Sequence, residues 1–305
     1  HEMAVCFVGG MAASLHGDHR LAALAAPALT EALAQARDNV EVRPDYPLPL
    51  VLALPAEGRP DDHESFARVV MEGMESRSGI ALDRQRSKVV RRDHAGFAHA
   101  LTVAQELFAE GLPLVAVGGV DSYFHPQVLD WLDGDFRLAS LRAEQGFLPS
   151  EAAAFVVFGN AKSSLAKLTA IDTATEPSDL DDELPNLAEA LTAMLAASEA
   201  RMGCPDWVIN DCNGERHRRL EFDLGAVRRL KWQTTISSWA DDLGDCGAAT
   251  GALYSAIAIQ LWQLSAATAD HVVITLASEA GERGLVSWQS PTAEKREPKQ
   301  AEAQA

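Results

Sequence analysis

Residues 111–159 read GLPLVAVGGVDSYFHPQVLDWLDGDFRLASLRAEQGFLPSEAAAFVVFG, and this stretch carries the strongest indication of the fold. It predicts a buried strand, a helix and a second apolar strand, at 113–117, 125–132 and 152–158. Gly118 and Gly119 follow the first strand, where glycine lets the chain turn sharply or lets another backbone approach closely. Glu151 precedes the second strand, and its carboxylate is costly to bury there unless it is paired or hydrogen-bonded.

Outward from this stretch, apolar strands alternate with helices along the chain. Further strands are expected at 3–8, 48–54, 88–92, 165–171, 207–210, 271–276 and 285–288, and residues 235–238 form a short segment that is not assigned to a strand or a helix. Further helices are expected at 20–36, 61–74, 95–110, 187–202, from 217 onward and at 247–264. Such alternation is typical of an α/β fold with a largely parallel sheet that is covered on both faces.

Two parts of the chain share one order of elements. Residues 95–117 and 247–276 each open on small residues, continue as a long helix and end in an apolar strand that glycine follows. This repeat indicates two related halves. We expect an N-terminal half at 3–160, a C-terminal half at 161–290 and a disordered polar tail at 291–305.

The charge balance restricts the partners of this protein. The 305 residues carry a formal net charge of −18, which argues against nucleic acid and against anionic membrane surfaces. A local basic patch is still compatible with this balance, formed by Arg216, Arg218, Arg219, Arg228 and Arg229. The acidic run at 179–183 is interpreted as solvated surface.

The hydrophobic and cysteine patterns indicate the compartment. The longest apolar stretch, 248–264, is interrupted by polar residues and predicts a buried helix rather than a membrane span. The four cysteines lie far apart without CxxC spacing, which predicts neither a disulfide framework nor a zinc site. No secretory signal peptide is recognised. We therefore expect a cytoplasmic protein with no bound metal or cofactor.

Five motifs resemble one family in the same order along the chain. GGVDS at 118–122 and GFLPSEAAA at 146–154 resemble motifs of the β-ketoacyl-(acyl carrier protein) synthases of the thiolase-fold superfamily. VCFVGG at 5–10, GDCGAATG at 244–251 and ASEAGERG at 277–284 resemble further elements of that family. The resemblance implies a five-layered αβαβα sandwich of two duplicated halves, usually assembled as a dimer.

The resemblance also locates the positions at which the family does its chemistry. That chemistry needs a cysteine nucleophile where a short strand meets a buried helix, and two further residues that stabilise the oxyanion and the carbanion. The nucleophile position falls at or next to His94, and the other two correspond to Asn213 and Asp245. No cysteine lies between Cys6 and Cys204. The resemblance thus implies a kept frame without its nucleophile, and no Claisen condensation.

His94 has two interpretations. It could act as a general base or acyl acceptor, or it could fill a vestigial pocket while hydrogen-bonded to Asp245 or Asp93. The second interpretation is favoured. Asp245 cannot take over the role of a histidine, because its carboxylate would repel a developing oxyanion.

Two cysteines also have a catalytic and a structural interpretation. Cys212 and Cys246 lie on loops expected to line the old pocket, where either could supply a relocated thiol with His217 or His94 as base. A free cysteine among small residues is more often a packing residue, and this interpretation is favoured.

Two polar segments have a structural interpretation as well. Residues 213–216 could bind an anion through Arg216, or form an Asn-Gly turn with an ion-pair network to Glu215 and Glu221. Glu151 is kept where the family uses a glutamate to tie loops together beneath the site.

The hypothesis that follows is a catalytically degenerate ketosynthase-like protein that serves as an adaptor or dimer partner. The family offers a precedent in chain-length-factor subunits, which keep the fold and lack the cysteine. The alternatives are a divergent acyltransferase or thioester-processing enzyme, and a binder of acyl ligands. The resemblance extends to short ketosynthase-like proteins of bacterial type VI secretion effector clusters, which would suit an adaptor.

The expected partner is another protein chain, in a homodimer or heterodimer, with acyl carrier protein or acyl-CoA as a further candidate. The family dimer pairs the strand next to the nucleophile segment, here 88–92. Lys88, Arg91 and Arg92 in that strand argue against a plain homodimer, because like charges would face each other across a two-fold axis.

Overall fold

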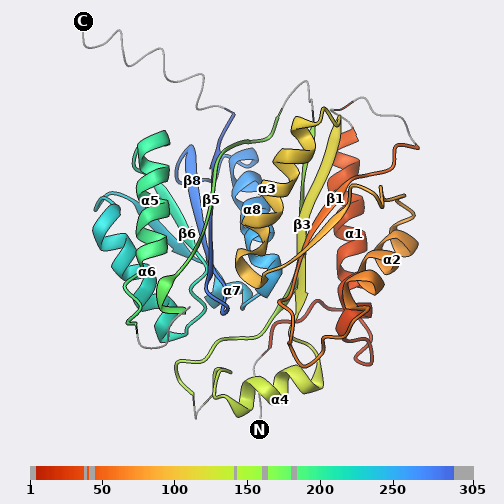
Figure 1. The fold of residues 1–305 in the computed structure, drawn as a ribbon, viewed down its shortest axis with the longest axis horizontal. Helices are drawn as coiled ribbons and strands as arrows, with labels where there is room; N and C mark the ends of the chain where they lie inside the picture. The colour runs from red at the N-terminus through yellow and green to blue at the C-terminus, as the bar shows by residue number, and fades with distance from the viewer. Residues whose placement is uncertain are drawn as a thin grey trace, which may run out of the picture.

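A computed structural model describes residues 5–37, 40, 45–140, 143–159, 164–179 and 184–291. Two β-sheets face each other across a pair of central helices, and further helices cover the outer face of each sheet (Figure 1). The expected five-layered αβαβα order is therefore present. No helix in the described ranges combines the length and apolar character needed to cross a bilayer.

The first sheet has the strand order β2-β1-β3-β4, in which β1 is parallel to β2 and β3, and β4 is antiparallel to β3. Alternate side chains of β1 enter different layers: Leu52 packs against the outer helices, and Val51 against the central ones. The elements of this half are α1 (Gly17–Arg37), β1 (Leu50–Leu54), α2 (Phe66–Ser78), β2 (Lys88–Arg91), the 3-10 turn η1 (Asp93–Ala95), α3 (Gly96–Ala109), β3 (Leu114–Ser122), α4 (Pro126–Gly134) and β4 (Glu151–Gly159).

The second sheet has the order β5-β9-β8-β6-β7 and repeats the same pairings. Strand β6 is parallel to β7 and β8, and β9 is antiparallel to β8. Its elements are β5 (Lys167–Thr175), η2 (Pro177–Asp179), α5 (Glu189–Met202), β6 (Trp207–Asn210), α6 (Arg216–Arg229), β7 (Thr235–Ser238), α7 (Ala240–Leu243), η3 (Gly247–Ala249), α8 (Thr250–Gln263), β8 (His271–Ala277) and β9 (Glu282–Gln289). The repeat seen in the sequence thus corresponds to two halves with one strand plan.

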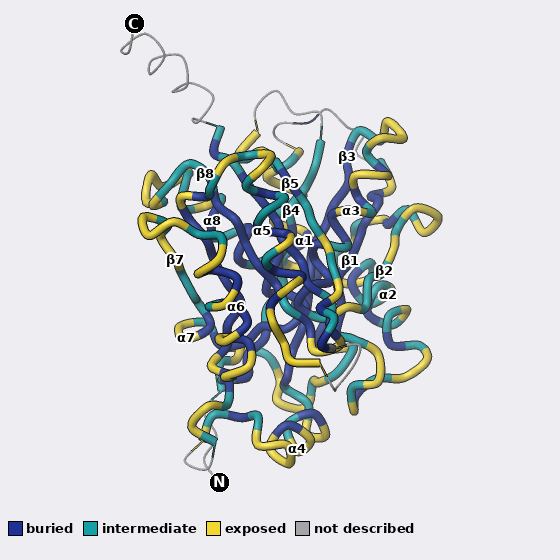
Figure 2. Tube along the Cα trace, turned by 60° about the vertical axis from the view of Figure 1, so that its left-hand side comes forward, coloured by how far each residue is buried: buried dark blue, intermediate teal, exposed yellow. Residues whose placement is uncertain are grey.

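Helices α3 and α8 form the central layer. Both are rich in apolar and small residues, as expected of helices that are packed on several sides. Gly251 permits their close contact, because a Cβ at this position would lie 2.8 Å from the Cβ of Phe97. Figure 2 shows that the buried residues gather along the strands and central helices, whereas α4 carries many exposed ones.

The predicted turn at Gly118 and Gly119 is wrong, because β3 continues through both glycines to Ser122. The other role proposed for them, close backbone approach, is confirmed. A Cβ on Gly119 would lie 2.3 Å from the carbonyl oxygen of Ala248, and one on Gly118 would lie 2.1 Å from the ring of Phe155. Gly119 lets the start of the α8 segment lie directly on the sheet, and Gly118 leaves room for the Phe155 ring of the neighbouring strand β4.

The N-terminal strand expected at 3–8 is also wrong where the structure describes it, from Val5 onward. Only an isolated bridge joins Cys6 to Ser150, and Phe7 and Val8 are exposed. The backbone here bonds to side chains instead, since Ser150 Oγ donates to the Cys6 carbonyl and the Val8 amide donates to a Glu151 carboxylate oxygen. Helix α2 begins at Phe66, whereas the sequence predicted a start at Asp61.

Three sequence expectations lie partly outside the described residues. These are positions 3–4 of the N-terminal strand, positions 180–183 of the acidic run, and the tail from 292 onward.

Replacing Gly119 with alanine should lower the free energy of unfolding by about 1–3 kcal/mol, because the added methyl group would overlap the Ala248 carbonyl. Urea unfolding followed by circular dichroism measures the change. Gly134→Ala at the end of α4 is the matched control, since no atom lies within 4 Å of its would-be Cβ. Equal stability of the two variants would contradict the close-packing role of Gly119.

Candidate functional site

The N-terminal ends of the two central helices meet between the sheets, where η1 packs against η3. Their first amide groups are buried and need hydrogen-bond acceptors. The Ala95 amide donates to Ser278 Oγ at 2.9 Å, and the Ala248 amide donates to Asp121 Oδ2 at 2.9 Å. Ser278 follows β8 and Asp121 lies in β3, so each half of the chain caps the central helix of the other.

Asp93 occupies a strained backbone position at the start of the α3 segment. Its φ is +51°, in the left-handed region that non-glycine residues rarely adopt. Gly247 has the same φ at the equivalent start of the α8 segment. The sequence located the nucleophile at or next to His94, and the residue that the structure finds strained there is Asp93. Only backbone geometry reveals this strain, so the sequence did not indicate it.

The three residues proposed for the site come together. His94 Nε2 donates to Asp245 Oδ1 at 2.8 Å, and Asn213 Nδ2 donates to Asp245 Oδ2 at 2.5 Å. The Gly247 amide adds a third hydrogen bond to Asp245 Oδ1 at 2.8 Å. The relative exposure of His94, Asn213 and Asp245 is 1%, 5% and 3%. These side chains thus occupy the site themselves, in the arrangement favoured for His94 from the sequence.

Charge fixes the protonation of this pair. Burial alone would lower the pKa of His94, but the Asp245 carboxylate, aided by Asp93, holds this pKa well above its usual value. Burial would raise the pKa of Asp245, but His94 and Arg218 hold it well below its usual value. The pair is therefore an imidazolium and a carboxylate near neutral pH.

A second charged network lies beside this pair, and sequence reasoning placed only Glu215 in it. Arg137 donates two hydrogen bonds to the Glu215 carboxylate, at 2.7 and 2.9 Å, and one to Glu279. Arg218 donates to Glu279 at 2.7 Å and to the Ala277 carbonyl at 2.7 Å. Burial raises the pKa of Glu279, but Arg218 and Arg137 lower it to about 2. The partners lie far apart in the chain, which hid this network from motif reading.

The sequence predicted an ion-pair network that includes Arg216, Glu215 and Glu221. Both glutamates form ion pairs, but with arginines other than Arg216. Arg216 is exposed and makes no ion pair among the described residues. Glu221 pairs instead with the buried Arg283, at 2.6 and 2.8 Å. The predicted turn after Asn213 is present, with Gly214 at a φ of +109°. The start of α6 lies so that Arg218 rather than Arg216 points inward.

Neither cysteine near the site offers a thiolate. Burial raises the pKa of both Cys212 and Cys246 to about 12. Cys212 belongs to the apolar cluster beneath α5 and α6, and Cys246 Sγ lies 3.7 Å from the Gly244 carbonyl oxygen. Within the described ranges, no hydrogen bond joins either sulfur to a histidine. The packing interpretation therefore fits both.

Glu151 is paired, as its burial requires. Arg20 of α1 donates to both of its carboxylate oxygens, at 2.5 and 2.6 Å, and Ser122 Oγ donates to one of them at 2.7 Å. These bonds, with the Val8 amide, hold the pKa of Glu151 below its usual value despite burial. The side chain thereby joins α1, the end of β3 and the N-terminal segment.

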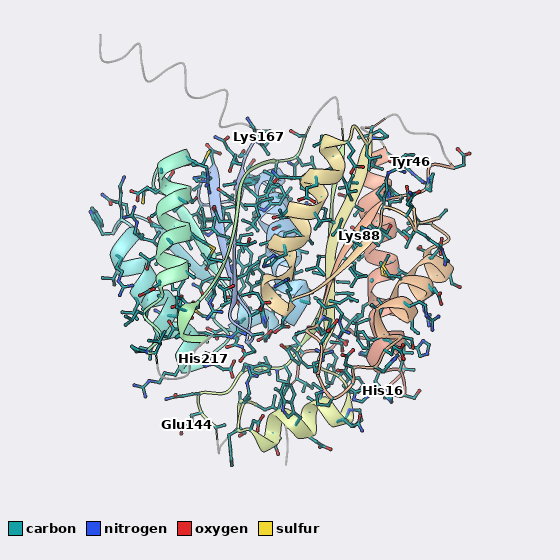
Figure 3. The ribbon with its side chains drawn as sticks, in the orientation of Figure 1. His16, Tyr46, Lys88, Glu144, Lys167 and His217 are labelled. Carbon is teal, nitrogen blue, oxygen red and sulfur yellow. The ribbon has the colours of Figure 1, made fainter. Side chains whose placement is uncertain are left out.

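One group of potential metal ligands lies beside the site. Oxygens of Glu215 and Glu279 and a ring nitrogen of His217 lie within 4.8 Å of one another. His217 lies at the end of the molecule where α4 is found (Figure 3). The guanidinium groups of Arg137 and Arg218 already neutralise both carboxylates. The donor set therefore fits an ion-pair network better than a cation.

Solved structures identify the fold. A type II polyketide synthase acyl-carrier protein complex with its ketosynthase matches with a TM-score of 0.73 at 12% identity, covering 90% of this chain and 86% of the other. The chain has the β-ketoacyl synthase fold. The ishigamide ketosynthase/chain length factor matches with a TM-score of 0.70, 17% identity and coverages of 94% and 87%. A β-ketoacyl synthase from Burkholderia phymatum STM815 matches with a TM-score of 0.71 at 13% identity, covering 94% of this chain and 88% of the other.

No protein-family model and no curated protein sequence matches the chain. The thiolase-like resemblance read from the motifs is thus confirmed at the level of fold, through structure rather than through overall sequence similarity.

Replacing His94 with glutamine should destabilise the protein by about 3–5 kcal/mol at pH 6, because the buried Asp245 carboxylate loses its cationic partner. The raised pKa of His94 sets the pH dependence. Its stabilising contribution is complete below the unfolded value of about 6.5 and is lost as the pH rises through the folded pKa.

The difference in Tm between wild type and His94→Gln should therefore be largest near pH 6 and shrink as the pH rises. His19→Gln, at an exposed position on α1, is the control and should follow the wild type throughout. A difference that does not depend on pH would contradict the ionised pair.

Proposed function

We propose that this chain is a catalytically degenerate ketosynthase-like protein that works as a partner or adaptor subunit. The observation that carries the proposal is the buried His94–Asp245 ion pair at the start of the central helices. A ketosynthase needs a thiolate and an oxyanion-binding group at this place. The ion pair supplies neither.

Each charged group of the pair opposes the family chemistry. An imidazolium at His94 has no free lone pair with which to accept a proton or an acyl group. A carboxylate at Asp245 would repel the negative charge that develops on a thioester oxygen. Cys212 and Cys246 cannot substitute, since their thiols stay protonated at neutral pH.

The edge of the first sheet supports a role in assembly. Strand β2 pairs only with β1 among the described strands, so one of its edges is open to a partner strand. Two of its flanking cations are already neutralised, Arg91 by Asp62 at 2.6 Å and Arg92 by Glu282 at 2.7 Å. Of the three cations in and next to this strand, only Lys88 has no ion pair among the described residues. This weakens the charge argument against a homodimer.

The solved complexes offer two kinds of partner for this proposal. One similar structure is a ketosynthase/chain length factor, and another holds an acyl-carrier protein with its ketosynthase. We propose a ketosynthase-like chain as the partner across β2, with acyl carrier protein as a further candidate. Service in a secretion-effector pathway is an extension of the adaptor role.

A divergent thioester-processing enzyme or acyl-ligand binder is the second candidate. One observation favours it: Asp93 is held at a strained φ beside His94, with Oδ2 3.3 Å from His94 Nδ1. Strained residues gather at active sites. The nearly complete burial of His94 and Asp245 weighs against this alternative.

Incubation with acetyl-, malonyl- and long-chain acyl-CoA and with acyl-carrier thioesters tests the proposal. Intact mass and release of free thiol are measured, with an active β-ketoacyl synthase as the positive control. We expect no covalent adduct and no thiol release above that of the thioester alone. Acyl transfer or hydrolysis that disappears in His94→Ala or Cys246→Ala would establish the second candidate instead.

A further inference from the structure

Helix α6 buries two charged residues beside the apolar Phe222 and Ala226, and it exposes aliphatic residues to solvent. Its buried residues include Arg218 and Glu221, which are satisfied by ion pairs to Asp211 and Arg283. Its solvent side carries three aliphatic residues, with exposures of 50%, 37% and 86% for Leu220, Leu224 and Val227. A helix whose only role is to cover a sheet normally has polar residues on its solvent side.

The three aliphatic residues form one surface, which we call the α6 stripe. Their spacing of four and three residues places them on the same side of the helix. Helix α6 lies with α5 in the outermost layer of the second half (Figure 1), so this side faces away from the sheet. Trp232 follows the helix by three residues and is a further exposed apolar residue of this segment, with 90% relative exposure.

The segment that carries the stripe is basic, although the protein is acidic. Residues 216–232 hold six of the 26 lysines and arginines of the chain and two of its 44 acidic residues. Arg216 before the stripe and Lys231 after it are exposed, and neither forms an ion pair among the described residues. The stripe thus lies between two free cations.

We propose that the α6 stripe binds an acidic amphipathic helix of another protein. Leucine-like residues of that helix would lie on Leu220, Leu224 and Val227, and its flanking carboxylates would face Arg216 and Lys231. Such a partner matches both the helical spacing of the stripe and the sign of its flanks.

Charge disfavours the other occupants. A second copy that used the same stripe would bring like cations together across a two-fold axis. An anionic membrane would attract the basic segment but repel a chain of net charge −18, and Asp223 lies on the solvent side of the same helix. Both occupants remain measurable outcomes.

The test uses a fluorescein-labelled helical peptide of about 18 residues, with leucine on one face and glutamate on the flanks. Fluorescence polarisation with the full chain should show saturable binding that weakens as salt is added. A scrambled acidic peptide and a version with lysine in place of glutamate should bind at least about tenfold more weakly.

Leu224→Ser/Val227→Ser should weaken binding about tenfold, and Arg216→Gln/Lys231→Gln should weaken it mainly at low salt. Leu264→Ser is the matched control, because Leu264 is 67% exposed but lies after α8. All these positions are exposed, so circular dichroism should be unchanged.

Three results would overturn the proposal. The acidic peptide fails to bind, or binds the serine variant as well as the wild type. Sedimentation shows a homodimer that the serine variant abolishes. Co-flotation with phosphatidylcholine–phosphatidylserine vesicles depends on the stripe while peptide binding does not.

Discussion

The buried starts of α3 and α8 are the constraint on which the rest of the structure depends. Water cannot reach their first amides, so these groups must find acceptors inside the protein. Ser278 and Asp121 provide them, each from the opposite half of the chain. The positive ends of both helices also favour anions nearby, which accounts for carboxylates at Asp93 and Asp245.

The same field explains which charges gather at this site. The start of the α8 segment stabilises the Asp245 carboxylate through the Gly247 amide, and His94 at the start of the α3 segment balances its charge. A network of further ion pairs lies beside His94 and Asp245, formed by Arg137, Arg218, Glu215 and Glu279. The result is a site filled by its own side chains.

The sequence predicted the alternation of elements, the duplication and the meeting of His94, Asn213 and Asp245, because these depend on local pattern and motif order. It missed the backbone strain at Asp93, since a residue's type alone does not reveal its φ. The Arg137–Glu215 bond joins residues 78 positions apart, so spacing gave no sign of it. It left two roles open for Gly118 and Gly119, because a glycine alone cannot distinguish a turn from a close contact.

The ionisation of His94 tests the central claim most directly. Histidine ring ¹⁵N chemical shifts can be followed by NMR from pH 5 to pH 9, with the His94→Gln variant used for assignment. The account predicts that His94 is an imidazolium at pH 7 and that its pKa lies well above the ordinary histidine value of about 6.5. A neutral ring at pH 7 would contradict it, since His94 would then be free to act as a base.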